Sequence, residues 1–248
     1  VFYPLSAKQL GYERVAKASS NGVAAHSTKE KAIEHGLLEL IERDAVAMAW
    51  YGQNPIFEIQ KQKLPPELIS AQSFWEKYAY HVRFFDITTD SIPVILCVFF
   101  SKKKFPYFIV GACANYSPNT ALLKAFYEAE YAMAAWDALG DAKMKEMDII
   151  RPLDHGMFYA QKKNSKIPFA HFNLSGAPRA HNRWTYNQLI EKFNPIVFTH
   201  HEGELYVERV ISEMLFPILF GYGLSVEGHR RFKDLNLTKK HNLTHFFP

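Results

Sequence analysis

Apolar residues recur with helical spacing in two long segments of the chain. The first, residues 28–50, contains no proline and a single glycine, and Ser27 or Thr28 can cap its start. The second, residues 120–139, is rich in alanine and leucine and is amphipathic. We expect both to be long helices, and a shorter helix over residues 67–78.

Between and after these helices the pattern changes to short runs of β-branched and aromatic residues. Three such runs cover residues 82–87, 93–100 and 107–113, and they predict strands. Further along, we expect a helix near residues 186–192 and strands over 195–200 and 204–212.

The order of these elements indicates the fold class. Strands and helices are grouped rather than strictly alternating, which favours an α+β fold with mixed open sheets flanked by long helices. With 248 residues, 48% of them hydrophobic, the chain can bury a sizeable core. We expect a single domain over residues 1–248, with a weak internal boundary near residues 140–182, where prolines and glycines are frequent.

Charge excludes several classes of protein. The 29 basic and 25 acidic side chains leave a net charge of +4, far from the signature of a nucleic-acid-binding protein. Neither a signal pattern nor an apolar run long enough to cross a membrane is found, so a cytoplasmic location is the default. Residues 101–104, Ser-Lys-Lys-Lys, lie between two expected strands and are interpreted as a solvated hairpin turn rather than an anion site.

One face of the first long helix carries candidate chemistry. Helical geometry places Glu39, Glu42 and Arg43 together, opposite the apolar arc that contains Leu37 and Ile41. Two carboxylates and a guanidinium could bind a divalent cation and a phosphate at once. The alternative is a solvated face with an ordinary pair between Glu39 and Arg43.

The residues around this helix closely resemble the signature of the YcaO family. The resemblance begins with Ser-Asn-Gly-Val-Ala-Ala-His at residues 20–26, continues with Ala-Ile at 32–33 and Gly-Leu-Leu-Glu at 36–39, and ends with Glu-Arg-Asp-Ala at 42–45. Three further stretches resemble the same family in the same order: residues 86–94, residues 111–128, and residues 210–223 together with His-Arg-Arg at 229–231.

The resemblance implies an ATP-dependent enzyme that activates peptide backbone amides. In this family the amide oxygen receives the γ-phosphate of ATP and then leaves as phosphate. The nucleophile is a Cys, Ser or Thr side chain in azoline formation, sulfide in thioamidation, or an amine in amidine formation. The expected cofactors are therefore ATP and Mg²⁺, bound without a P-loop.

The resemblance also implies roles for particular residues. Glu39, Glu42 and Glu128 would bind Mg²⁺, with Glu30 as a further candidate, and Arg43 would contact phosphate. Against this, Glu128 could be a surface glutamate, and Arg230 and Arg231 could be part of a basic C-terminal tail. The remaining candidates for contacting the nucleotide are Lys124, Arg230 and Arg231.

Departures from the family pattern leave a second reading open. Lys31 stands where an acidic residue is expected, and Lys124 where glutamine is frequent. The family's proline-rich C-terminus is reduced to one proline in residues 243–248, and only 19 residues precede Ser20, so we expect an N-terminal part of the family fold to be missing. These features favour a degenerate module that binds peptide or a partner protein without ATP turnover.

Partners follow from the same resemblance. The enzyme reading implies a precursor peptide as substrate and a separate leader-binding partner protein, with a homodimer also allowed. No nucleic acid or membrane is expected as a partner. The residues do not specify which peptide is modified or which product forms.

Overall fold

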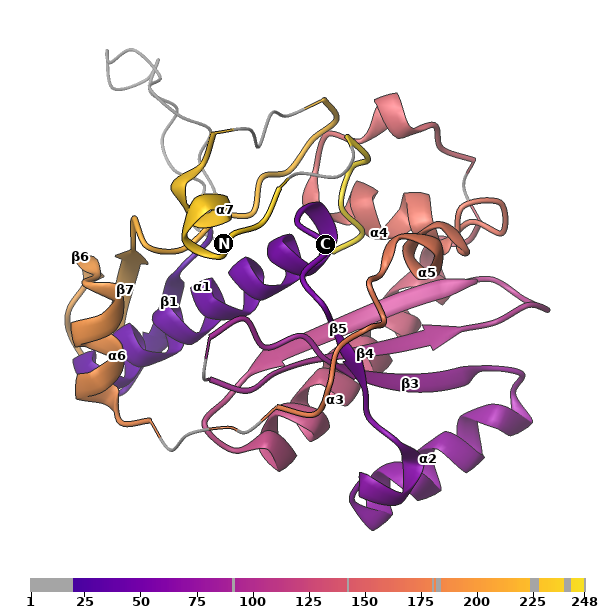
Figure 1. The fold of residues 1–248 in the computed structure, drawn as a ribbon, viewed down its shortest axis with the longest axis horizontal. Helices are drawn as coiled ribbons and strands as arrows, with labels where there is room; N and C mark the ends of the chain where they lie inside the picture. Colours follow the sequence, from indigo (N-terminus) through magenta and orange to yellow (C-terminus); the bar gives the residue numbers. More distant parts are fainter. Residues whose placement is uncertain are drawn as a thin grey trace.

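The computed structural model describes residues 20–247, apart from 91, 142, 180, 182–183, 224–227 and 239–241. Its centre is one long helix that runs between two antiparallel sheets (Figure 1). The strands are β1 (Val23–His26), β2 (Phe57–Glu58), β3 (His81–Asp86), β4 (Val94–Phe100), β5 (Phe108–Ala114), β6 (Ile196–His201) and β7 (Tyr206–Ile211). The α-helices are α1 (Lys29–Tyr51), α2 (Pro66–Lys77), α3 (Pro118–Leu139), α4 (Pro152–Ala160), α5 (Ile167–His171), α6 (Tyr186–Phe193) and α7 (Arg230–Asp234), with short 3-10 helices η1 (Lys61–Lys63) and η2 (Glu146–Asp148).

Helix α1 is buried on most of its circumference. It begins after Thr28, whose hydroxyl accepts the backbone N–H of Lys31, and it ends at Gly52. One side packs against β1 and β7, and the other against β4 and β5. The sequence predicted a single apolar arc on this helix, and the buried surface is wider than that arc. A helix between two sheets needs apolar residues on both sides.

The larger sheet has the order β2-β3-β4-β5 and is covered on both faces. Along β4, residues such as Leu96 and Val98 belong to the core that surrounds α1. The alternate residues, including Cys97 and Phe99, belong to a second core beneath α3. Alternation of side chains thus buries both faces, which explains why the sequence of this strand is apolar without interruption.

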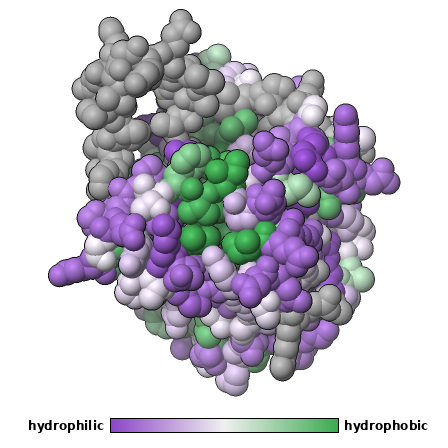
Figure 2. Space-filling view, turned by 90° about the vertical axis from the view of Figure 1, so that its left-hand side faces the viewer, coloured by the Kyte–Doolittle hydropathy of each residue, from purple (hydrophilic) through white to green (hydrophobic). Residues whose placement is uncertain are grey.

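The smaller sheet has the order β1-β7-β6, and within the described residues the long helices cover one of its faces, the one that packs on α1. Val210 of β7 points toward α1 and is fully buried. On the outward face the side chains of Ile196, Phe198 and Ile211 are exposed. Strands β6 and β7 lie on the left-hand side of Figure 1, and Figure 2 shows an apolar patch on that side of the molecule.

The predicted fold class is confirmed, and so are most of the predicted elements. Helices α1, α2, α3 and α6 and strands β3 to β7 fall where the apolar pattern placed them. The pattern did not predict β1, β2 or α7. Within residues 140–182, where an irregular region was expected, α4 packs against β5 and brings Tyr159 into the core. No helix in the described part of the chain is long and apolar enough to span a bilayer.

Candidate functional site

Four of the predicted site residues meet where α1 passes the last residues of β5. Glu39, Glu42 and Arg43 lie on adjacent turns of α1, and Glu128 approaches from α3. The two glutamates of α1 are three residues apart, so their side chains leave the same side of the helix. We call these four residues the glutamate cluster.

Glu39 is fixed by the turn that precedes β1. Its Oε2 accepts the backbone N–H of Gly22 at 2.7 Å, and its Oε1 accepts from Arg43 Nε at 3.1 Å. Gly22 has φ +73°, and a Cβ there would lie 2.2 Å from the carbonyl oxygen of Val210. Only glycine fits this close approach, which gives the Ser-Asn-Gly motif a structural role: it aims an N–H at Glu39.

Glu42 and Glu128 both bond to the free edge of β5. The backbone N–H of Ala114 donates to Glu42 Oε2 at 3.3 Å, and the N–H of Ala112 donates to Glu128 Oε2 at 2.8 Å. Residues two apart on a strand direct their N–H groups to the same edge, so the two carboxylates are brought side by side from different helices. Gly111 allows this approach, because a Cβ there would lie 2.4 Å from the backbone of α3.

The glutamate cluster carries an excess of negative charge. Burial, together with the nearby charge of Glu128, raises the pKa of Glu42 well above its ordinary value. Glu128 is exposed as a residue, yet partial desolvation beside the edge of β5 raises the pKa of its carboxyl group to about 6, and Glu39 adds to the effect. Arg43 opposes both shifts but is a single cation among three carboxylates. A divalent cation would relieve this repulsion.

Arg43 has donor capacity that the protein does not use. Its guanidinium lies near the rings of Phe220 and Phe247, with its central carbon 5.7 and 5.9 Å from the ring centroids. Nε and one terminal nitrogen bond to Glu39, whereas the buried Nη1 has no hydrogen-bond acceptor in the described part of the chain. A buried unpaired donor is costly unless an anionic ligand supplies the acceptor.

The C-terminal segment, residues 243–247, forms part of this wall. Trp50 donates its indole N–H to the carbonyl oxygen of Leu243 at 3.1 Å, and Phe246 and Phe247 are buried. His155 Nδ1 lies 2.8 Å from the carbonyl oxygen of His245, and the two rings stack with centroids 4.1 Å apart. These contacts hold Phe247 beside Arg43. The sequence offered one signal for this role, the aromatic residues at the very end of the chain.

Of the two lysines that depart from the family pattern, Lys124 lies one turn before Glu128 on α3, whereas Lys31 lies about 12 Å before Glu39 along α1. Lys31 pairs with Glu34 at 2.5 Å. Lys124 is exposed and has no carboxylate within 4.0 Å in the described residues, although Glu128 follows it by one helical turn. Burial and the charges of His26 and Lys124 lower the pKa of His35.

Cys113 lies next to the cluster but has no reactive character. Burial and the charge of Glu42 raise its pKa to about 12. The thiol therefore stays protonated at neutral pH, and its packing role agrees with its place in an apolar strand.

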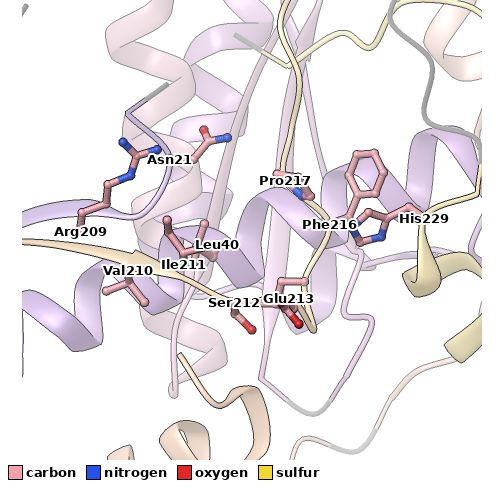
Figure 3. A pocket seen from close by; sticks show the side chains of 11 residues that line it. Asn21, Leu40, Arg209, Val210, Ile211, Ser212, Glu213, Phe216, Pro217 and His229 are labelled. Carbon is pink, nitrogen blue, oxygen red and sulfur yellow. The ribbon is translucent and has the colours of Figure 1, made fainter. Parts of the chain in front are cut away.

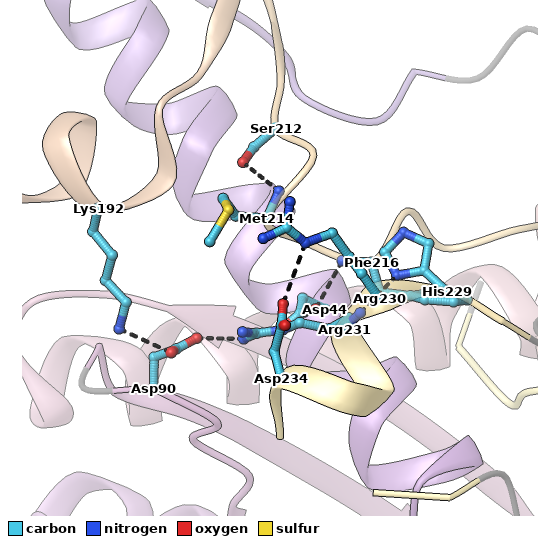
Figure 4. A network of polar contacts seen from close by, with 10 residues as sticks. All are labelled: Asp44, Asp90, Lys192, Ser212, Met214, Phe216, His229, Arg230, Arg231 and Asp234. Carbon is cyan, nitrogen blue, oxygen red and sulfur yellow. Dashed lines mark hydrogen bonds and ion pairs between the residues drawn. The ribbon is translucent and has the colours of Figure 1, made fainter. Parts of the chain in front are cut away.

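The remaining candidates lie elsewhere. Glu30 is exposed in the first turn of α1, nine residues before Glu39, which is about 13 Å along a helix. Arg230 pairs with Asp234 on the surface at 3.4 Å. Arg231 is buried and bonds to Asp44 through two nitrogens, at 2.7 to 3.0 Å, and to Asp90 (Figure 4). We therefore leave Glu30, Arg230 and Arg231 out of the cluster.

A separate hollow of 270 Å³ lies on the other side of α1 (Figure 3). Its lining includes Leu40 of α1, Ile211 of β7, Phe216 and His229, and its surface is mostly apolar. None of the residues of the glutamate cluster lines it. It is therefore not a candidate for binding the metal.

The donor set fits a nucleotide-bound Mg²⁺ better than a metal held by protein alone. Within the described residues, no three His, Cys, Asp or Glu side chains are placed to hold a metal ion by themselves. Mg²⁺ at nucleotide sites usually takes one or two carboxylates and completes its shell with phosphate oxygens and water. Adjacent carboxylates with raised pKa values and the unpaired nitrogen of Arg43 match that arrangement.

Comparison with known proteins gives one sequence family and several related structures. The profile of the family described as YcaO cyclodehydratase, ATP- and Mg²⁺-binding, matches residues 1–212. A search of curated proteins finds no match.

Three solved structures illustrate the structural similarity. A heterocyclase in complex with substrate and cofactor aligns with a TM-score of 0.66 and 24% identity, over 84% of this chain and 29% of its own. The E. coli microcin synthetase McbBCD complex with pro-MccB17 bound gives 0.67 and 14%, over 94% and 64%. YcaO from Methanopyrus kandleri, bound with AMPPCP and Mg²⁺, gives 0.60 and 16%, over 98% and 63%. The chain thus spans less than two thirds of each of these proteins.

Proposed function

The chain belongs to the YcaO family, and from this premise we propose that it uses ATP and Mg²⁺ to activate a backbone amide of a peptide. The expectation of ATP and Mg²⁺ as cofactors agrees with the description of the family. The observation that carries the proposal is the glutamate cluster: three carboxylates from two helices converge around one arginine whose Nη1 has no partner in the described chain.

In the proposed mechanism each residue of the cluster has a distinct task. Glu42 and Glu128 supply oxygen ligands at the edge of β5, and Glu39 orients Arg43 while itself held by Gly22. Glu42 and Glu128 would hold Mg²⁺, which would neutralise phosphate charge and so favour phosphoryl transfer. Arg43 donates to a phosphate oxygen through Nη1, the nitrogen that the protein leaves unpaired.

The proposed reaction converts the amide oxygen into a leaving group. A nucleophile adds to the amide carbon, the former carbonyl oxygen takes the γ-phosphoryl group of ATP, and the C–O bond breaks to release phosphate. With a Cys, Ser or Thr side chain as nucleophile the products are an azoline, ADP and phosphate; with sulfide they are a thioamide, ADP and phosphate. The likeness to a heterocyclase favours the azoline as the first product to assay.

Substrate and partners belong to the same proposal. We take a ribosomal precursor peptide as substrate and a separate leader-binding protein as partner, because one similar structure is a synthetase complex with its pro-peptide bound. We also treat residues 1–248 as a single unit. A homodimer remains part of the proposal.

Calorimetric titration of the full chain with ATP, with and without Mg²⁺, tests the core of this function. We expect Mg²⁺-dependent binding that weakens about tenfold or more in Glu42→Gln, since the amide keeps the bond to Ala114 but loses the charge. Glu76→Gln on α2, an equal change at an exposed site, serves as the control and should bind as the wild type does.

The same titration decides the alternative, a degenerate module that binds peptide or protein without ATP turnover. Lys124, one turn before Glu128 on α3, favours that reading, because a cation repels Mg²⁺. Binding of ATP that needs no Mg²⁺, or no binding at all, would support it and rule out the enzyme. Mn²⁺ electron paramagnetic resonance gives an independent count of bound metal.

A further inference from the structure

A basic cavity lies at the end of the larger sheet opposite the glutamate cluster. It has a volume of 520 Å³, and four of its lining residues are cations: Arg83, Lys102, Lys162 and Lys166. It also contains Tyr107, which directly precedes β5, whereas Glu42 bonds to Ala114 at the other end of that strand. Seven residues of extended chain separate the two places by about 20 Å.

Arg83 is held in a fixed orientation within the basic cavity. Both Nε and a terminal nitrogen bond to Glu58, at 2.7 and 2.5 Å. The guanidinium also lies over the rings of Phe85 and Phe169, 5.0 and 5.3 Å from their centroids. Its position is thus set before any ligand binds, which reduces the entropy lost on binding.

The other three cations are not neutralised by the protein. Lys102, Lys162 and Lys166 are exposed, and in the part of the chain that is described none has a carboxylate within 4.0 Å. The carboxylate of Glu58 is the counter-ion of Arg83 alone. The cavity therefore carries a local excess of positive charge, on a molecule whose overall charge is only +4.

Aromatic rings complete the lining. Phe100, Tyr107 and Phe169 are half-buried there, and the rings of Phe100 and Phe169 meet edge to face with centroids 5.2 Å apart. Lys162 Nζ lies 5.9 Å from the centroid of the Tyr107 ring. A ligand that suits these walls has both anionic groups and a ring of its own.

The distribution of the cations favours a peptide over a phosphate. They come from three segments: β3, the connection between β4 and β5, and the stretch before α5. A phosphate site usually gathers free backbone N–H groups around one point. In the connection after β4, the N–H groups of Lys103 and Lys104 already donate to the hydroxyl of Ser101.

We propose that the basic cavity binds an acidic peptide segment in which carboxylates flank an aromatic side chain. The carboxylates pair with the lysines and Arg83, and the ring packs between Tyr107 and Phe169. The tetrapeptide at residues 101–104, interpreted from sequence as only a solvated turn, supplies Lys102 to the site. Binding requires neither ATP nor Mg²⁺, so this proposal stands apart from the proposed function.

Fluorescence anisotropy of the full chain with labelled peptides tests the proposal. The probe is Glu-Glu-Phe-Glu-Glu, compared with Gln-Gln-Phe-Gln-Gln and Glu-Glu-Ala-Glu-Glu. We expect the first to bind at least about tenfold more tightly than either of the others, with an affinity that falls as salt is raised. The double variant Lys162→Glu/Lys166→Glu should lose about tenfold or more in affinity for it.

Matched variants separate the cavity from general charge. Lys77→Glu/Lys143→Glu makes the same change at two exposed lysines outside the cavity, and it should bind nearly as the wild type does. Lys102→Glu provides a second test from another segment. Equal loss in both double variants, equal binding of the glutamine peptide, or displacement of the peptide by inorganic phosphate at equal concentration would overturn the proposal. Glu42→Gln should leave peptide binding unchanged.

Discussion

Two neighbouring residues of α1, Arg43 and Asp44, belong to polar clusters of opposite character. Arg43 is the single cation of the glutamate cluster, which holds three carboxylates and has an unpaired nitrogen in the described chain. Asp44 belongs to a cluster with Asp90, Arg231 and Lys192, in which two carboxylates meet two cations (Figure 4). The charges of the glutamate cluster are therefore unbalanced, whereas those of the cluster around Asp44, the neutral cluster, cancel.

The two clusters differ in burial, since only Asp44 and Arg231 are buried residues, and also in how completely their charges are paired. Asp44 is almost fully buried, and it accepts the backbone N–H of Phe216 at 2.8 Å as well as the bonds from Arg231. Burial raises its pKa to about 6, while Arg231 opposes the shift. For Glu42 the nearby carboxylates add to the effect of burial. A complete network stabilises a fold, whereas an incomplete one leaves room for a charged ligand.

The largest effect is expected from breaking the neutral cluster. Arg231→Ala leaves Asp44 buried without its counter-ion, and removal of one partner of a buried pair typically costs about 3–5 kcal/mol in the free energy of unfolding. Chemical denaturation measures this loss. Arg230→Ala, the same change at the exposed pair with Asp234, should cost less than about 1 kcal/mol.

A loss of stability that is equal in both variants would show that the network around Asp44 contributes no more than a surface pair. If Arg231→Ala does not fold, Lys192→Ala tests the same network more gently, because this lysine bonds only to Asp90 at the edge of the cluster. Titration with ATP adds a second readout. Lys192→Ala should keep the ATP affinity of the wild type, since the neutral cluster is not part of the proposed site.

The sequence predicted much of the fold and part of the difference between the glutamate cluster and the neutral cluster. Alternating and helical patterns located the long helices and the central strands, because those elements bury regular faces. Helical geometry placed Glu39, Glu42 and Arg43 on one face, and they lie on adjacent turns of α1; their roles stay predictions. The sequence around Arg231 did not reveal that this residue pairs with Asp44 and Asp90, because these partners lie 187 and 141 residues away along the chain. Its assignment as a phosphate contact therefore had no local pattern to test it.

Other parts of the site were also beyond local patterns. The bond from Gly22 to Glu39 depends on a turn with positive φ next to β7, and β7 lies far along the chain. The position of Phe247 depends on contacts between the C-terminus, α4 and Trp50. Such long-range packing has no periodicity that a sequence window can detect.

A smaller effect is expected from the wall beside Arg43. Phe247→Leu keeps an apolar side chain of similar volume and should cost less than about 1.5 kcal/mol in stability. It removes the ring face beside the guanidinium, a contact worth about 0.5–2 kcal/mol, so the affinity for ATP with Mg²⁺ should fall about twofold to thirtyfold. Calorimetric titration measures the change.

The matched control is Phe246→Leu, the same substitution one residue earlier. Phe246 packs on Trp50, with ring centroids 5.3 Å apart, and makes no ring contact with Arg43. The Phe246→Leu variant should be less stable than the wild type but should keep its affinity for ATP with Mg²⁺. Equal affinity losses in the two variants would mean that Phe247 acts only through the packing of the C-terminal segment.

The smallest expected effect is the pH dependence of stability without metal. Because the pKa of Glu42 is raised in the folded state, repulsion is absent at low pH and develops as the pH rises from about 4.5 through 6 and above. In EDTA, wild type should therefore lose stability across this range relative to Glu42→Gln, by about 2–4 °C in Tm if the cost is near 1 kcal/mol. Mg²⁺ with ATP should raise the Tm of wild type at pH 7 by more than that of the variant, because the variant binds the nucleotide about tenfold more weakly or worse. Parallel melting curves for the two proteins at every pH would mean that Glu42 is already balanced, and the contrast with Asp44 would disappear.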